Sequence, residues 1–212
     1  MATRTPEGLE DHEDGARRCW WAGRTPDYVA YHDEEWGRPV GDDHRLYEKL
    51  CLEGFQSGLS WLTILRKREG FRRAFAGFDP EAVARFGERD VERLLADASI
   101  VRHRGKIEAA IHNASRVLEV REKHGSLSAF AWQFEPPKAE RPKRVTKAAL
   151  MTMAKTPGSV RFAKALKAHG FKFVGPTTAY AFMQAMGLVN DHLEGCASRP
   201  VVEAARARFP RP

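Results

Sequence analysis

The sequence predicts an all-α fold in one domain. Apolar residues recur at steps of three and four along several stretches, runs that alternate apolar and polar residues are almost absent, and glycines or prolines stand where these stretches begin and end. With 212 residues, of which 42% are hydrophobic and 30% charged, the chain can bury a sizeable core and is not a disordered segment.

The helical pattern first appears in residues 43–75. One apolar stripe there includes Leu46 and Leu50, and a second stripe begins after a break at Gly58. Asp79-Pro80 then predicts an N-cap followed by proline in the first helical turn, which opens a short helix through Phe86.

Another helix is expected to start at Asp90, and the longest one covers about residues 105–124. In that helix Ile107, Ala110 and Ile111 begin a series at steps of three and four, and Gly125 stops it. Shorter helices are expected at residues 127–132, 159–168 and 177–186.

The domain is expected to span residues 17–198, between a flexible polar tail at 1–16 and a C-terminal tail at 199–212. Residues 135–147 contain three prolines and five Lys/Arg residues, which is typical of a basic loop. This loop could be mobile, or it could be ordered and face DNA.

The charge balance favours a polyanionic partner, because 35 Lys and Arg against 28 Asp and Glu give a net charge of +7. No apolar run approaches the roughly 20 residues that span a membrane, and residues 1–18 lack the apolar core of a secretory signal. Three cysteines are too few for a disulfide framework. We therefore expect a cytoplasmic monomer without a membrane partner.

Residues 159–187 are expected to form two helices joined by a short turn, a helix–hairpin–helix. Gly170 is placed to end the first helix and Gly175 to cap the second, whose free N–H groups and dipole suit a phosphate. An ordinary antiparallel helix pair fits the same spacing. The basic flank, with Lys172 on the turn, and the apolar Phe173 favour DNA.

Two Cys/His pairs stand at opposite ends of the chain. Cys19 and His32 have twelve residues between them, and His192 and Cys196 have three. Two thiolates and two imidazoles suit a tetrahedral structural zinc, although the spacing matches no zinc finger and each residue could be an ordinary core residue. Such a site would close a loop of well over a hundred residues, and the entropic cost of closing that loop is about 4–5 kcal/mol by the logarithmic law.

One carboxylate, Glu53, lies among aromatic residues, with Phe55 and Trp61 following it and a cluster of Trp and Tyr at residues 20–36. Aromatic residues usually form core, but a buried unpaired carboxylate is costly. Glu53 is therefore either paired with Arg or Lys or positioned for a cationic or hydrogen-bond-donating ligand. Aromatic faces, a carboxylate and a basic surface together suit an extruded base.

Four motifs in this order resemble the 3-methyladenine DNA glycosylase I family of the helix–hairpin–helix DNA glycosylase superfamily. They are TyrValAlaTyrHisAspGluGluTrpGly at 28–37, LeuGluGlyPheGlnSerGlyLeuSerTrp at 52–61, IleValArgHisArgGlyLysIle at 100–107, and the segment from GlyPheLysPheValGlyPro to LeuValAsnAspHis at 170–192. The resemblance runs from about Cys19 to Cys196. It implies the all-α helix–hairpin–helix glycosylase fold, with a structural zinc that joins the N- and C-terminal segments.

The resemblance assigns roles to individual residues. It implies a zinc site at Cys19, His32, His192 and Cys196. It implies a base pocket at Trp21, Tyr28, Tyr31, Glu53 and Trp61, with Glu53 and Tyr31 as the catalytic candidates and Trp21 preferred to its neighbour Trp20. The expected DNA-binding residues are Gly58, Leu59, Lys172, Gly175 and Thr177, with Leu59 as the wedge that fills the vacated stack. Asn190 stands where many relatives in the superfamily have a catalytic Asp.

The implied activity is base-excision repair of double-stranded alkylated DNA. The enzyme would hydrolyse the N-glycosidic bond of flipped-out 3-methyladenine, with 3-methylguanine as a further candidate, and leave an abasic site. The alternative is a non-catalytic zinc-stapled helix–hairpin–helix DNA-binding protein, which has no need of a desolvated acid such as Glu53. A lyase would need a nucleophilic lysine in the pocket, and the motifs expected to line it contain none.

Overall fold

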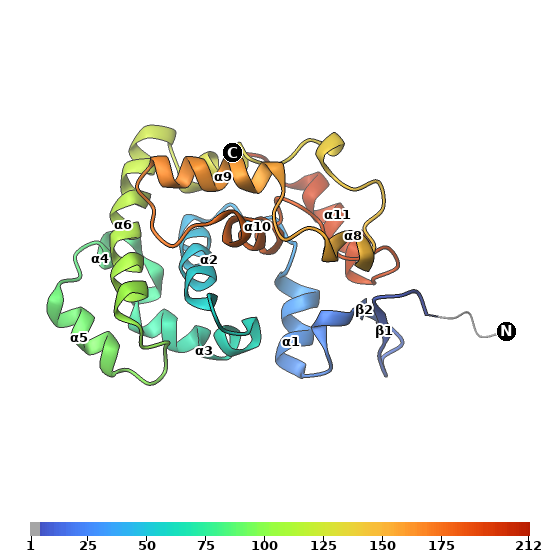
Figure 1. The fold of residues 1–212 in the computed structure, drawn as a ribbon, viewed down its shortest axis with the longest axis horizontal. Helices are drawn as coiled ribbons and strands as arrows, with labels where there is room; N and C mark the ends of the chain where they lie inside the picture. Colours follow the sequence, from blue (N-terminus) through green and yellow to red (C-terminus); the bar gives the residue numbers. More distant parts are fainter. Residues whose placement is uncertain (1–4) are drawn as a thin grey trace.

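A computed structural model describes residues 5–212, and most of these residues lie in helices (Figure 1). The elements are β1 (Leu9–Asp11), β2 (Arg17–Cys19), α1 (Pro26–Ala30), α2 (Asp43–Gln56), α3 (Trp61–Ala74), α4 (Pro80–Val83), α5 (Glu88–Ala96), α6 (Arg104–His124), α7 (Leu127–Trp132), α8 (Lys147–Met151), α9 (Pro157–Ala168), α10 (Pro176–Ala185) and α11 (Ser198–Arg208). A π-helical turn, Tyr31–Glu35, follows α1 directly. The mostly helical prediction is confirmed.

Helix α2 runs through the middle of the molecule and packs against α3, α6, α7 and α10 (Figure 1). Every residue from Leu46 to Phe55 is buried, so α2 has no solvent-facing side along most of its length. Polar groups in this helix therefore need partners, and Tyr47 donates a hydrogen bond from its hydroxyl to Ala110 O at 2.7 Å.

The expected helix boundaries hold with small differences. Gly58 lies in the break between α2 and α3, and Gly125 ends α6 with a φ of +85°. Helix α5 begins at Glu88, two residues before Asp90, because the Asp90 carboxylate accepts a hydrogen bond from Gly87 N at 3.1 Å and so acts from inside the first turn. Helix α4 ends at Val83 and does not reach Phe86.

The N-terminal segment is a correction to the expectation of a flexible tail at 1–16. Residues Leu9–Asp11 form β1, which pairs antiparallel with β2, while residues 1–4 lie outside the described part of the chain. Leu9 is only 7% exposed, and Arg17 and Arg18 form ion pairs with the acidic residues of this segment. The acidic composition of this segment favoured a solvated tail, but in the structure Asp11 and Asp14 form ion pairs with arginines of the β1–β2 hairpin.

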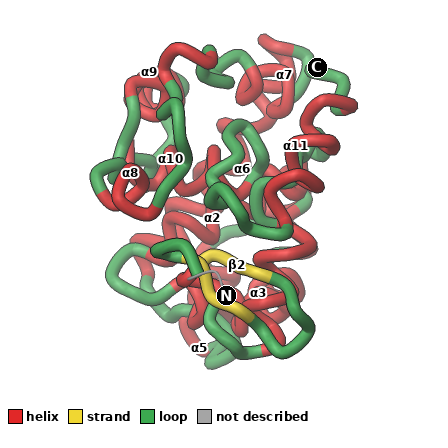
Figure 2. Tube along the Cα trace, turned by 90° about the vertical axis from the view of Figure 1, so that its right-hand side faces the viewer, coloured by secondary structure: helices red, strands yellow, loops and turns green. Residues whose placement is uncertain are grey.

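The C-terminal segment is also ordered, because residues 198–208 form α11 and bury Val202 completely. Figure 2 shows the β1–β2 hairpin, α8 and α11 on the same side of the molecule. The basic loop at 135–147 is attached to the body by ion pairs from Arg141 to Asp191 and from Arg144 to Glu194. Within residues 5–212, no helix is long and apolar enough to cross a membrane.

Candidate functional site: an aromatic pocket and a buried Cys/His cluster

A pocket of about 270 Å³ opens between α1, α2, α3, α8 and α10. Its lining consists of Trp20, Trp21, Tyr28, Tyr31, Trp36, Glu53, Gln56, Trp61, Leu150, Met151, Ala181 and Gln184. All five residues expected to form a base pocket are therefore brought together around one cavity. Trp20 lines it as well as Trp21, so the two neighbouring indoles share the wall.

The aromatic wall is continuous around Trp21. The Trp21 ring centroid lies 5.4 Å from that of Tyr28 and 4.7 Å from that of Trp36, and the Tyr31 and Trp61 centroids are 5.3 Å apart. These are ordinary edge and tilted packing distances, which hold the rings rigid while leaving faces available to a planar ligand. The wall is therefore formed before any ligand arrives.

Glu53 lies in this wall and is paired with a lysine that the sequence analysis did not identify. Lys49, one helical turn earlier on α2, places Nζ 2.8 Å from Glu53 Oε1, and the two side chains are 6% and 5% exposed. The same Nζ donates to Tyr31 Oη at 2.9 Å and lies 3.3 Å from the centroid of the Trp61 ring. The i,i+4 spacing of Lys49 and Glu53 was the available sequence signal.

Burial and charge shift the protonation of these groups. Burial lowers the pKa of the Lys49 ammonium, and the adjacent Glu53 carboxylate opposes that shift. Burial, together with the charge of Glu53, raises the pKa of the Tyr31 phenol well above its usual value and raises that of Tyr28 as well. Both phenols therefore keep their protons at neutral pH and can act as donors.

Several pocket residues were missed in the sequence. Gln56 follows Glu53 by one turn on α2, Met151 stands 68% exposed on α8, and Gln184 lies on α10. Gln184 donates to Asp191 Oδ2 at 2.9 Å, which fixes its position through a fully buried carboxylate. Asn190 does not line the pocket, because its amide donates to Arg199 O and Glu203 Oε2, both at 3.1 Å, toward α11.

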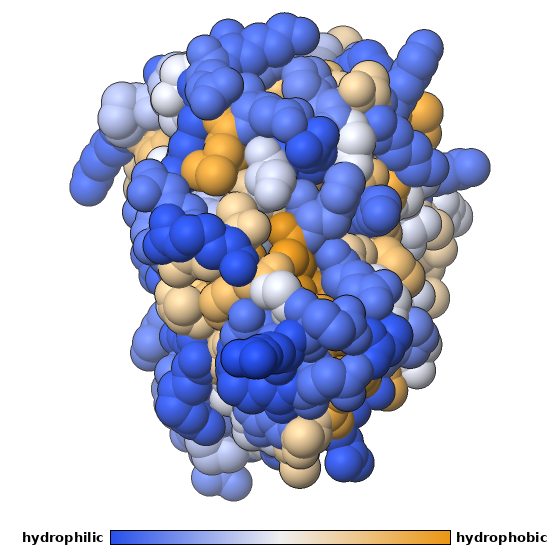
Figure 3. All heavy atoms as spheres, turned by 90° about the vertical axis from the view of Figure 1, so that its left-hand side faces the viewer, coloured by the Kyte–Doolittle hydropathy of each residue, from blue (hydrophilic) through white to orange (hydrophobic). Residues whose placement is uncertain are grey.

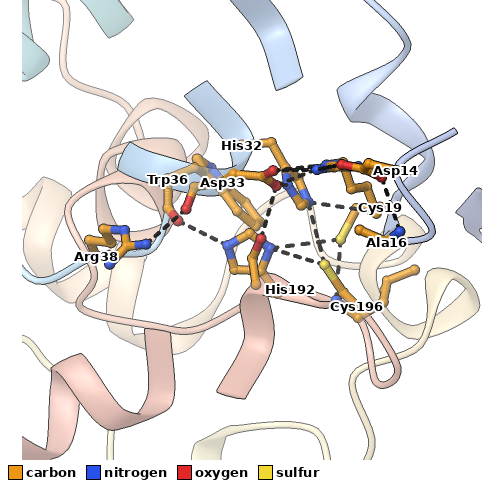
Figure 4. Close-up of polar contacts among 12 residues, drawn as sticks. Asp14, Ala16, Cys19, His32, Asp33, Trp36, Arg38, His192 and Cys196 are labelled. Atoms are coloured by element: carbon orange, nitrogen blue, oxygen red, sulfur yellow. Dashed lines mark hydrogen bonds and ion pairs between the residues drawn. The ribbon is translucent and has the colours of Figure 1, made fainter. Parts of the chain in front are cut away.

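A second cluster lies beside the aromatic wall and is completely buried (Figure 4). The ligand atoms of Cys19, His32, His192 and Cys196 all lie within 4.8 Å of one another. Cys196 Sγ is 3.5 Å from His32 Nε2 and 3.6 Å from His192 Nδ1. The four residues that were proposed from both ends of the chain thus form one group able to hold a metal ion.

The imidazoles of the cluster are oriented by their second nitrogens. His32 Nδ1 is hydrogen-bonded to Asp33 Oδ1 at 2.7 Å, and His192 Nε2 to Trp36 O at 2.9 Å (Figure 4). Such contacts direct the other nitrogen of each ring toward the cluster, as is usual for metal-ligating histidines, and His32 Nε2 there accepts a hydrogen bond from Cys19 N at 3.3 Å. The hydrogen bond between the two thiols lowers the pKa of Cys196 and raises that of Cys19, so without a metal Cys196 is the thiolate of the pair.

The pocket and the cluster are joined through adjacent residues. In the π-helical turn, Tyr31 lines the pocket while His32 belongs to the cluster. The Trp21 ring centroid is 5.0 Å from that of His32, and the Trp36 centroid is 4.8 Å from that of His192. The cluster therefore supports the rear of the aromatic wall.

The expected DNA-binding residues lie on two neighbouring loops. Gly58 has a φ of +84°, a left-handed conformation that favours glycine, and Leu59 beside it is 41% exposed. Gly175 caps α10, and the exposed Thr177 follows in its first turn. A hollow of about 360 Å³ lies between the two loops and includes Ser57, Lys167 and Gly175 in its lining, so the loops border one surface.

The hairpin turn is held by α6. Asn113 donates from its amide to Lys172 O at 3.0 Å and accepts from Lys172 N at 2.8 Å. The Lys172 side chain is exposed, and Gly170 has a φ of +80° where α9 ends. Figure 3 shows the side of the molecule that carries α4 to α6, where hydrophilic residues cover most of the surface and an apolar strip crosses the middle.

Comparisons with known proteins agree with this geometry. The profile of the methyladenine glycosylase family matches residues 21–199. DNA-3-methyladenine glycosylase 1 of Escherichia coli (strain K12) is 49% identical over 183 residues, which cover 86% of this chain and 97% of that protein.

Solved structures are similar as well. A crystal structure of 3-methyladenine DNA glycosylase I has a TM-score of 0.79 at 48% identity and covers 85% of this chain and 98% of that one. The Staphylococcus aureus enzyme, solved to define its recognition of 3-methyladenine, has a TM-score of 0.79 at 38% identity, with 85% and 95% covered. With the family profile spanning most of the chain and a relative at this identity, the chain belongs to the methyladenine glycosylase family.

Proposed function

We propose that this protein is a monofunctional DNA-3-methyladenine glycosylase. It hydrolyses the N-glycosidic bond of a 3-methyladenine flipped out of double-stranded DNA and leaves an abasic site. The carrying observation is the carboxylate of Glu53 in the wall of a preformed aromatic pocket, in a chain of this family.

Hydrolysis of this N-glycosidic bond depends more on recognition of the alkylated base than on acid catalysis. A base alkylated at N3 carries a positive charge in DNA and departs as a neutral molecule, so its leaving group needs little protonation. Stacking on Trp61 supplies a cation–π preference of about 0.5–2 kcal/mol over a neutral base. The carboxylate of Glu53 accepts from the exocyclic amine and attracts the cation, while Tyr31 offers a second polar contact.

The DNA contacts follow from the two loops that border one surface. The N–H groups at the start of α10, with Gly175 and Thr177, hold a phosphate, and Lys172 adds charge. Leu59 enters the stack that the flipped base leaves, because it is an exposed apolar side chain on the turn between Gln56 and Trp61, which both line the pocket.

A lyase mechanism is disfavoured by the position of Lys49. Its ammonium is buried behind the wall and held by Tyr31 and Glu53, and it does not line the pocket. A Schiff base would need an unprotonated amine beside the sugar carbon. The expected product is therefore an intact abasic strand.

Base release is the direct test. Methylated duplex DNA is incubated with the wild-type protein and with Glu53→Gln, and the free bases are separated by chromatography. Loss of the charged contact, worth about 1.5–3 kcal/mol, should slow 3-methyladenine release by roughly one to two orders of magnitude.

Glu48→Gln is the matched control. Glu48 lies on the same helix, is 7% exposed and is paired with Arg72 at 2.8 Å, but it does not line the pocket. It should lower the melting temperature without slowing release by the folded protein. If the wild-type protein binds methylated DNA and releases no base, the non-catalytic DNA-binding alternative replaces this proposal.

We further propose that the Cys/His cluster binds one structural zinc ion. Two sulfurs and two nitrogens in a closed, buried set suit tetrahedral zinc, and no ligand position faces the pocket for catalysis. When bound, the ion would join the N-terminal segment to the loop before α11 and support the aromatic wall.

Elemental analysis tests the zinc assignment. One zinc per chain is expected in the purified protein, and Cys196→Ser should lose it. Cys51→Ala is the control, because Cys51 is buried in the core away from the cluster and should leave the zinc content unchanged. Wild-type protein without zinc would rule the assignment out.

A further inference from the structure

The contacts of Lys49 constrain the hydrogen atoms of the pocket. An ammonium group has three donors and no acceptor. Since Lys49 Nζ lies 2.9 Å from Tyr31 Oη, the tyrosine oxygen must accept, and its own hydrogen points elsewhere. Since Nζ also lies 2.8 Å from Glu53 Oε1, that oxygen is occupied as an acceptor.

The Tyr31 hydroxyl and the Glu53 carboxylate each keep hydrogen-bonding capacity that Lys49 does not use. Among residues 5–212, no hydrogen-bond acceptor is found for the Tyr31 hydroxyl hydrogen, and no donor is found for Glu53 Oε2. Both side chains line the pocket. The pocket therefore presents one donor and one acceptor, and Lys49 prevents the two from satisfying each other.

This polarity matches one edge of adenine. Adenine carries an amine donor at N6 beside an acceptor at N7, whereas guanine carries acceptors at both O6 and N7. An adenine-type base can donate its amine to Glu53 and accept from Tyr31. A guanine-type base would place its carbonyl oxygen against the carboxylate.

We propose that Lys49 is a positioning residue that sets this hydrogen-bond polarity and so makes the pocket select adenine-type over guanine-type alkylated bases. The inference rests on the base pocket of the proposed function. Lys49 does not touch the base. It acts through Tyr31 and Glu53. Its ammonium also lies 3.3 Å from the centroid of the Trp61 ring and so holds that ring in place beside the two polar groups.

Two substitutions separate polarity from simple support of the fold. Lys49→Arg keeps a cation with donors only, so the polarity is retained. Lys49→Gln has an acceptor as well as a donor, so the Tyr31 oxygen is no longer forced to accept. The Tyr31 hydroxyl can then donate to Glu53 and occupy the acceptor that only the amine of an adenine-type base uses. Arg72→Gln is the control, because it removes the partner of the buried Glu48 on the same helix.

Free 3-methyladenine and free 3-methylguanine are titrated into each protein, with melting curves recorded alongside. Wild type should favour 3-methyladenine, and Lys49→Arg should keep the ratio of the two affinities within about threefold. Lys49→Gln should reduce that ratio about tenfold or more, chiefly by weakening 3-methyladenine. Arg72→Gln should change the melting temperature but not the ratio.

Tyr31→Phe gives a second test that does not depend on the folding of Lys49 variants. It removes the donor but leaves the Lys49–Glu53 pair, and both bases present an acceptor to that donor. Both affinities should therefore fall alike, with their ratio preserved. A Tyr31→Phe protein that binds both bases as tightly as wild type would overturn the donor role.

The outcomes distinguish this inference from the proposed function. If Glu53→Gln weakens 3-methyladenine while folded Lys49→Gln keeps both affinity and ratio, Lys49 is only a structural partner and the inference fails alone. If wild type binds neither base, or if Glu53→Gln and Trp61→Ala are also without effect, the pocket assignment fails and takes the inference with it.

Discussion

Trp61 contacts both the pocket and the buried charged pair of Lys49 and Glu53. It lines the pocket, while the Lys49 ammonium lies over its ring. Its indole N–H is buried and has no hydrogen-bond partner within residues 5–212. The Trp61 indole therefore contributes ring area and electrostatics to the pocket, and its N–H makes no hydrogen bond within residues 5–212.

Replacing Trp61 by Ala should weaken the binding of free 3-methyladenine by about tenfold or more, because the stacking surface of the indole is lost. Trp61→Phe keeps a smaller ring and should retain part of the affinity. Fluorescence-independent titration, such as calorimetry, measures both. Equal affinity in Trp61→Ala and wild type would show that the base does not stack on this side of the pocket.

At the scale of elements, two short segments do most of the positioning. The π-helical turn sends consecutive residues, Tyr31 and His32, to the pocket and the cluster. The α9–α10 turn is fixed by paired hydrogen bonds between Asn113 and the Lys172 backbone. A rigid turn presents its N–H groups to a phosphate at little entropic cost on binding.

DNA binding should be largely independent of sequence and should weaken steeply with salt, because the contacts proposed for the α9–α10 turn are to phosphates and the chain has a net charge of +7. Lys172→Ala should lower DNA affinity and reduce the salt slope by about one, without altering which base is released. Arg208→Ala, on the exposed side of α11, is the control. A DNA affinity that stays flat from low to high salt would contradict the hairpin assignment.

At the scale of the molecule, the Cys/His cluster connects residues more than 170 positions apart, since Cys19 Sγ lies 3.9 Å from His192 Nδ1. The same cluster contacts the aromatic wall through Trp21 and Trp36. A metal there would stabilise the fold by joining the chain ends and would stiffen the pocket.

Removal of the metal with a chelator should lower the melting temperature by about 10 °C or more, which follows from a closure free energy of about 4–5 kcal/mol. Affinity for 3-methyladenine should fall in parallel, and added zinc should restore both. Circular dichroism melting before and after dialysis is the measurement. A melting temperature that the chelator leaves unchanged would contradict a structural role for the metal.

Stability should also decline at alkaline pH. Burial raises the pKa of Tyr31 and of Tyr47 well above 10, the value expected in the unfolded chain. Above pH 10 the unfolded state therefore loses protons that the folded state keeps, and the free energy of unfolding falls as pH rises. Below pH 10 these groups cause no such dependence.

Urea unfolding between pH 9 and 11 measures this effect, which is about 1.4 kcal/mol per pH unit for each tyrosine. Tyr47→Phe should be less stable overall, since it loses the hydrogen bond to Ala110 O, but its stability should fall less steeply with pH. An identical slope in both proteins would mean that Tyr47 ionises in the folded state.

Sequence alone determined the helices that have strong local signals. It also identified the Cys and His residues of the cluster and the aromatic residues of the pocket. The apolar spacing of α2 and α6, the Asp79 cap and the glycine stops act within a few residues of one another, so they are visible without a structure. The Cys/His set was visible because the chain has only three cysteines, and two of them stand near a histidine at opposite ends of the sequence.

Only the tertiary structure decided what depends on contacts between distant segments. The N-terminal strand forms because its acids meet Arg17 and Arg18 and because Leu9 packs with Cys19, Leu193 and Cys196. The pairing of Glu53 was open in the sequence, since a carboxylate among aromatic residues could await a ligand or a partner. The i,i+4 spacing places Lys49 beside Glu53, but only burial of residues 46–55 encloses this pair and brings Lys49 against Tyr31 and Trp61, because a charge in the core needs its counter-charge there.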